Sequence, residues 1–174
     1  MVVVAIAAIL IAVAAPSFQS LILKNRVQSV ASDFQSALAT ARSEAIKRGG
    51  DTRVTVVANS KVAGTPDWAS GFTVFLDTTS DANGDAPSAD ATKLLMQTSA
   101  APLGVQASVN FNHIIYNGRG RSMASTGAPL AGVAAFGAPG SNWICTIISL
   151  SGRVRTATVT DTVYNAPGGG CPTN

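Results

Sequence analysis

The sequence predicts an α+β protein in which one long N-terminal helix packs by its second half on a β-rich domain and protrudes by its first half. Three observations predict this lollipop shape. Residues 1–15 carry no polar side chain, residues 27–45 place apolar side chains at helical spacing, and short β-branched or aromatic runs follow residue 50. The length of 174 residues suits one globular domain with an appendage.

The apolar run is the first element, and residues 1–23 carry no charge. As a helix they would span about 34 Å, compared with about 30 Å for the hydrocarbon core of a bilayer. Lipid or neighbouring helices tolerate a proline as a bend, so the helix can continue beyond position 16. We therefore predict a membrane or assembly helix that contains Met1, Val4, Ile6, Ile9, Leu10, Ile11, Pro16 and Phe18.

Two alternatives to a membrane span follow from the same run. A secretory signal peptide is disfavoured because no basic residue precedes the run and Pro16 follows the candidate cleavage site. A helix that is apolar all round can instead be covered by protein in a helical assembly.

Residues 24–50 continue as an amphipathic helix. Lys47 and Arg48 suit the negative end of the helix dipole, and Gly49 and Gly50 then end the helix. The apolar residues recur at steps of three and four, which places one stripe against the globular domain: Val27, Val30, Ala31, Phe34, Ala37, Leu38, Ala41 and Ala45.

Residues 51–174 predict an antiparallel β-rich domain, because short β-branched or aromatic runs alternate with turn residues. We expect exposed loops over residues 77–92 and 117–142, which are rich in Gly, Ala, Ser, Pro and Asp. Strands are predicted over 53–57, 72–76, 109–111, 114–116 and 143–148. The last of these continues through Ser151 and Gly152 into a second strand, which predicts a hairpin over residues 143–159.

Charge is segregated along the chain, although the formal net charge of +3 alone does not indicate a nucleic-acid binder. Residues 1–50 and 118–174 each carry a net charge of +3, whereas residues 65–92 carry −5. Only 12% of residues are charged and 47% are hydrophobic, which argues against a charge-rich disordered chain. Two basic regions thus flank an acidic segment.

The two cysteines are Cys145, in a predicted strand, and Cys171, in the C-terminal tail. An even pair in a chain that looks exported predicts a disulfide, which would close a loop of about 26 residues and contribute about 3 kcal/mol. Two unrelated thiols in a cytosolic protein are the alternative.

Catalytic and metal sites are not predicted. His113 is the only histidine and has no acid, nucleophile or metal ligand at a useful spacing, so we expect no enzyme, metal or cofactor. Asp77, Asp81, Asn83 and Asp85 alternate as in a calcium loop, but no glutamate follows at the proper distance. A solvated turn is the expectation for residues 77–90, with calcium binding as the alternative.

The apolar run, Pro16 and the helix that ends in the segment 41–48 resemble type IV pilin-like proteins, in particular the GspH/FimT group of minor pilins and pseudopilins. Segments 68–77, 116–121 and 151–155 also resemble the globular region of that group. The resemblance implies a pilin-like fold and a single-pass protein of the inner membrane with its globular domain in the periplasm. It further implies assembly with other pilin or pseudopilin subunits into a filament through the N-terminal helix.

Members of this group are made with a basic leader that a prepilin peptidase removes before a sequence of the type Phe-Thr-Leu-Ile-Glu-Leu. The given chain begins at Met1, inside the apolar run. We therefore expect the leader and the glutamate to be encoded upstream.

The segment 152–155, Gly-Arg-Val-Arg, resembles the Gly-Arg-x-Arg motif that is implicated in DNA capture for natural transformation in the FimT branch. The resemblance implies that Arg153 and Arg155, which share a strand face, bind double-stranded DNA without sequence specificity. Arg119 and Arg121 would add phosphate contacts from a glycine-rich loop. The alternative is a hairpin turn with solvated arginines in a GspH-like pseudopilin of a type II secretion system that binds no DNA.

Overall fold

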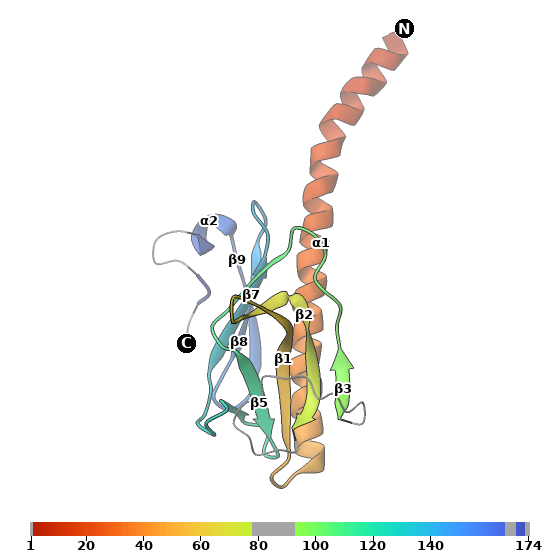
Figure 1. The fold of residues 1–174 in the computed structure, drawn as a ribbon. Helices are drawn as coiled ribbons and strands as arrows, with labels where there is room; N and C mark the ends of the chain where they lie inside the picture. The colour runs from red at the N-terminus through yellow and green to blue at the C-terminus, as the bar shows by residue number, and fades with distance from the viewer. Residues whose placement is uncertain (1, 78–92, 166–169, 173–174) are drawn as a thin grey trace.

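The computed structural model describes residues 2–77, 93–165 and 170–172, except the side chains of residues 4–17. Helix α1 (Val2–Arg48) runs without interruption through Pro16, and its N-terminal half protrudes from the globular domain (Figure 1). The side chains predicted for the membrane or assembly helix, apart from Phe18, lie outside the described residues. Within the described part, no helix is both long and apolar enough to cross a membrane.

The second half of α1 packs on the domain as the periodicity predicts. All eight apolar residues of the predicted stripe are at most 7% exposed. Phe34 lies at its centre, where its ring centroid is 5.3 Å from that of Phe72 and 5.2 Å from that of Phe136. These two partners belong to different sheets, so the helix stripe joins both sheets in one core.

Two antiparallel sheets form the rest of the described domain (Figure 1). One has the strand order β3-β2-β1-β5-β6 and the other the order β4-β7-β8-β9. The strands are β1 (Arg53–Val62), β2 (Thr65–Asp77), β3 (Leu94–Gln97), β4 (Gln106–Val109), β5 (His113–Asn117), β6 (Ser122–Met123), β7 (Gly132–Gly137), β8 (Trp143–Ile148) and β9 (Val154–Val159). A short helix, α2 (Asp161–Tyr164), follows β9.

The predicted exposed loop over residues 117–142 is wrong, because β6 and β7 lie within it. Strand β7 consists largely of glycine and alanine, and such residues resemble a loop in sequence. Glycine is required at position 137, because a side chain there would overlap the ring of Trp143. The predicted strand over residues 109–111 is also displaced, since β4 ends at Val109. Strand β3 is an additional strand that the sequence does not predict.

The disulfide predicted from the sequence joins Cys145 to Cys171, with their Cα atoms 5.7 Å apart. Cys145 lies on the face of β8 that points away from α1, and it packs there with Ala135 and Trp143. Tyr164 of α2 stacks on Trp143 at a centroid distance of 3.9 Å. Tyr164 and Cys171 therefore cover the part of the outer face that is formed by Ala135, Trp143 and Cys145.

Candidate nucleic-acid interface

The first glycine-arginine segment, residues 118–121, forms the turn between β5 and β6. Asn117 shapes this turn, because its Oδ1 accepts hydrogen bonds from the backbone N–H groups of Arg119 (3.1 Å) and Arg121 (3.0 Å). The N–H of Gly120 also donates to the Asn117 carbonyl, at 2.7 Å. With the backbone held in this way, both arginine side chains are exposed.

The second segment lies at the β8–β9 hairpin, whose turn is held by Ser149. The carbonyl oxygen of Ser149 accepts a hydrogen bond from the N–H of Gly152 (2.8 Å), and the Oγ atom of Ser149 accepts one from the N–H of Arg153 (3.2 Å). Gly152 has φ +77°, a left-handed conformation that glycine adopts without strain. The two following arginines, Arg153 and Arg155, are exposed.

Arg155 lies on the outer side of the second sheet. Arg155 is directly opposite Ile147 in the antiparallel register, so their side chains share one face. The intervening Val154 packs instead against the main core. Arg153 immediately precedes β9, so the shared strand face of Arg153 and Arg155 stays a prediction from the sequence.

The two segments, which are far apart in sequence, touch through their glycines. A Cβ atom at Gly152 would overlap the carbonyl oxygen of Gly120, and it would lie 3.0 Å from Cε1 of Tyr116. Only a residue without a side chain permits this approach. We call the four arginines carried by these two segments, Arg119, Arg121, Arg153 and Arg155, the arginine patch.

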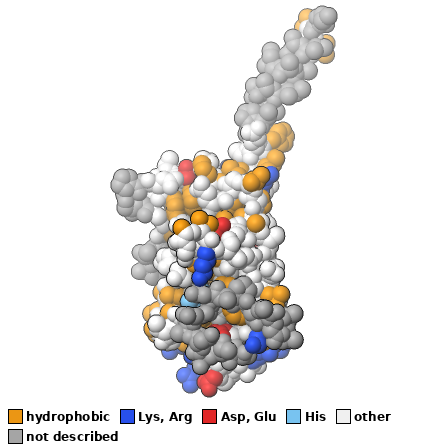
Figure 2. Space-filling model, viewed as in Figure 1, with side chains coloured by type: hydrophobic (Ala, Val, Ile, Leu, Met, Phe, Trp, Pro, Cys, Tyr) orange, Lys and Arg blue, Asp and Glu red, His pale blue; other side chains and the backbone are white. Residues whose placement is uncertain are grey.

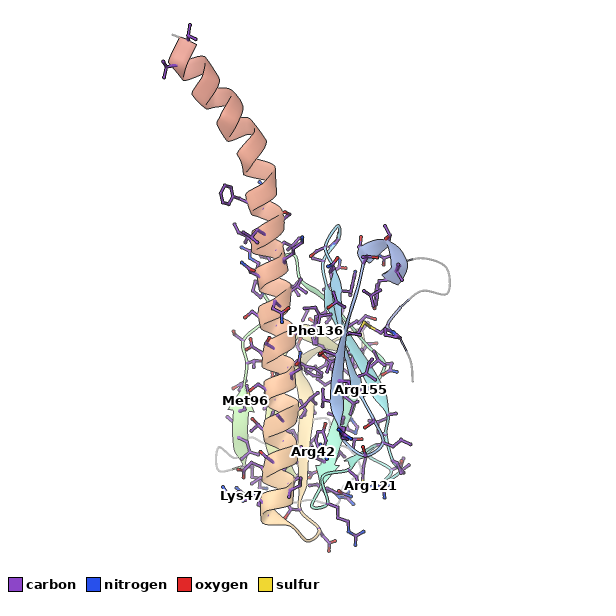
Figure 3. All side chains as sticks on the ribbon, turned by 180° about the vertical axis from the view of Figure 1, so that it is seen from behind. Arg42, Lys47, Met96, Arg121, Phe136 and Arg155 are labelled. Carbon is purple, nitrogen blue, oxygen red and sulfur yellow. A yellow bond between two sulfur atoms is a disulfide. The ribbon has the colours of Figure 1, made fainter. Side chains whose placement is uncertain are left out.

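Helix α1 contacts both glycine-arginine turns through residues near its C-terminal end. Arg42 donates a hydrogen bond from Nη2 to the carbonyl oxygen of Ser151 at 3.4 Å. A Cβ atom at Gly120 would lie 2.6 Å from Cδ1 of Ile46, so the helix packs directly on the first turn. In Figure 3, Arg42 lies on α1, Arg121 in the turn that precedes β6, and Arg155 on β9.

The electrostatics at this end of the domain are predominantly positive. Figure 2 shows Lys and Arg side chains gathered around the end opposite the protruding helix. Glu44 forms salt bridges with Lys47 (3.5 Å) and Arg48 (3.2 Å), and the hydrogen bond from Arg48 holds the pKa of the Glu44 carboxyl below its usual value. The four arginines of the patch form no ion pair with any described residue.

The remaining candidates do not join this surface. His113 opens β5, and Asp77 ends β2 as a buried residue. Asp81, Asn83 and Asp85, the other members of the suggested calcium loop, lie outside the described residues. Among the side chains that are described, no cluster of three potential metal ligands occurs.

Sequence reasoning did not identify Arg42, Asn117 or Ser149 as parts of the interface. A signal for Asn117 exists, because Asn before Gly-Arg-Gly is typical of a turn in which the side chain caps the backbone. The role of Arg42 depends on how the helix is placed relative to two distant turns. No local pattern contains that information.

A single long N-terminal helix packed on an antiparallel β domain defines a pilin-like protein. The family model described as "Type II transport protein GspH" matches residues 30–162, which is well over half of the chain. The chain belongs to the GspH family, a pilin-like family of structural rather than catalytic proteins. No curated protein matches its sequence.

The fold is also that of a solved minor pilin. The crystal structure of the type IV minor pilin FimU of Pseudomonas aeruginosa strain PAO1 in space group P21 matches with a TM-score of 0.57 and 20% identity, over 76% of this chain and 89% of FimU. The structure of FimU in space group P65 gives a TM-score of 0.54 and 19% identity, over 75% and 91%. These matches confirm the pilin-like fold predicted from the sequence.

Proposed function

We propose that the protein is a FimT-like minor pilin that enters a type IV pilus through α1 and binds double-stranded DNA through the arginine patch. The observation that supports the DNA part is the contact between Gly120 and Gly152, because it places the two turns that carry the arginine pairs against each other. Arginine is suited to phosphate because its guanidinium presents several donors in a planar arrangement.

Exposed apolar side chains on the protruding helix support the filament part. Phe18, Leu21 and Ile22 are 61%, 53% and 50% exposed in the isolated chain. Such surface is stabilised when lipid or a neighbouring helix covers it. We propose that the inner membrane covers it before assembly, with the globular domain in the periplasm, and that other pilin subunits cover it in the filament.

Duplex DNA suits the patch better than a single strand. Proteins that bind single strands without sequence preference stack the bases on exposed aromatic side chains. In this protein every aromatic residue except Phe18 and Tyr164 is buried. Those two lie on the protruding helix and on α2, whereas the patch lies at the opposite end of the domain (Figure 1). The patch therefore offers charge for a phosphate backbone without a stacking surface.

Binding of the full chain in nonionic detergent to a short fluorescent duplex tests the DNA part. We expect a Kd in the micromolar range and a fall in log K with log salt, at about 0.9 per phosphate contact.

The double variant Arg153→Gln, Arg155→Gln should abolish binding. Lys24→Gln with Lys61→Gln is the matched control, because it removes the same charge from residues outside the patch. Absence of binding by the wild type at low salt, or equal loss in the control, contradicts the proposal.

The second candidate is a GspH-like pseudopilin of a type II secretion system that binds no DNA. The family model favours it, because its description refers to type II transport. In this alternative the arginines would be solvated side chains of two turns. The same binding assay separates the two candidates, since the pseudopilin would give no anisotropy change at any salt concentration.

A further inference from the structure

Arg42 is half-buried beside the two turns of the arginine patch, and one atom of its guanidinium is fully buried. Its Nε atom is inaccessible to solvent and has no hydrogen-bond partner among the described residues. Burial of a charged or polar group costs free energy unless the group is paired. The hydrogen bond from Nη2 to Ser151 is long, at 3.4 Å, so it offsets only part of that cost.

The guanidinium touches both turns that carry the arginine patch. It contacts the hairpin through the carbonyl of Ser151. It contacts the first turn through Gly120, where an added Cβ atom would lie 3.1 Å from Nε of Arg42. Because Gly152 rests on Gly120, the three segments form one continuous junction.

No described acidic side chain forms an ion pair with Arg42. Tyr116, which packs against Gly152, has a buried hydroxyl that also has no hydrogen-bond partner among the described residues. Burial raises the pKa of Tyr116 to about 12, against the opposing effect of Arg42, so the phenol is neutral at physiological pH. Glu44, on the same helix, is already paired with Lys47 and Arg48.

We infer that Arg42 is a positioning residue of the DNA site, which holds the turn 118–121 and the hairpin turn 149–153 at a fixed spacing. The inference rests on the proposed function, because it concerns the same arginine patch. A fixed spacing matters because side chains that are already ordered lose less entropy when they bind several phosphates at once. The patch then acts as one site with four arginines rather than as two separate pairs.

Arg42→Gln and Arg42→Lys in the full chain test the inference in the same duplex assay. Lysine keeps the charge but lacks the planar group that spans Ser151 and Gly120. We expect both variants to weaken binding by about tenfold. We also expect a smaller salt slope, because fewer phosphates are contacted together at about 0.9 each. Lys47→Gln is the control on the same helix, with an expected change below about twofold.

Two results would overturn the inference. If Arg42→Lys binds with the affinity and salt slope of the wild type, Arg42 acts through its charge alone. If Arg42→Gln is silent while Arg153→Gln with Arg155→Gln abolishes binding, the inference fails and the proposed function stands. Absence of DNA binding by the wild-type protein would contradict both the inference on Arg42 and the proposed function.

A charge-neutral variant keeps the test decisive if the Arg42 variants unfold at a lower temperature. Gly152→Ala removes no charge but forces the two turns apart, since its Cβ would overlap Gly120. Gly127→Ala is the matched control, with a similar φ of +80° and no atom within 4 Å of the added Cβ. We expect Gly152→Ala to weaken binding and Gly127→Ala to leave it unchanged. Equal affinity of these two variants contradicts the shared junction.

Discussion

Phe34 shows how much of this fold depends on single residues. It is fully buried, and edge-to-face contacts join it to Trp68 (5.6 Å) and Phe72 (5.3 Å). Phe34→Ala would leave a cavity where the helix and both sheets meet, so we expect it to lower the free energy of unfolding by about 3–5 kcal/mol in urea titrations. Phe18→Ala, at a 61% exposed position of the same helix, should change it little. A loss below about 1 kcal/mol for Phe34→Ala would contradict its central role.

The elements differ in how far the sequence predicts them. The α1 stripe from Val27 to Ala45 was predicted fully, because a helix buries residues at a period that local sequence records. Strand β8 is predicted because four of its six residues are β-branched, which favours a strand locally. Strand β7 was missed because small residues are selected there by Trp143, a neighbour that the chain meets only after folding. The junction of Gly120, Gly152 and Arg42 was missed for the same cause.

The C-terminal element depends on one carboxylate. Asp161 accepts hydrogen bonds from Trp143 Nε1 (2.8 Å), the N–H of Gly140 (3.1 Å) and Asn165 Nδ2 (2.6 Å). The bond from Trp143 is the main cause that holds the pKa of the Asp161 carboxyl below its usual value of 3.8. A lowered folded pKa means that the stabilisation is complete above the unfolded pKa and is lost as pH falls through the folded pKa.

We therefore predict that α2 and the stack of Tyr164 on Trp143 loosen below about pH 4. Thermal unfolding followed by near-UV circular dichroism should show Asp161→Asn with a lower Tm than the wild type at pH 7. The difference should shrink as pH falls below about 4. Asp33→Asn, on the exposed face of α1, is the control and should follow the wild type. A constant difference across the whole pH range would show that the charge of Asp161 does not matter.

At the scale of the whole molecule, the exposed Phe18, Leu21 and Ile22 lie on α1 far from its C-terminal end, where Arg42 and Ile46 contact the two glycine-arginine turns. Among the described side chains of this helix, the buried ones begin at Val27, and Arg26 adds one hydrogen bond from its Nη1 to the carbonyl of Leu103 (3.0 Å). The exposed side chains of residues 18–22 contribute little to the core, although Leu23 packs against it. The Gly120–Gly152 junction is built entirely from residues beyond that point.

This separation predicts that a fragment of residues 24–174 keeps both the fold and the patch. We expect its Tm to be within a few degrees of that of the full chain in detergent, because few buried contacts are removed. Its Kd for duplex DNA should agree within about twofold, since the phosphate contacts are the same. A fragment beginning at residue 35 is the contrasting variant and should not fold, because it lacks Phe34 and half of the buried helix stripe. If the fragment of residues 24–174 folds but binds DNA much more weakly, the N-terminal helix takes part in the site, and the two ends of the molecule do not act independently.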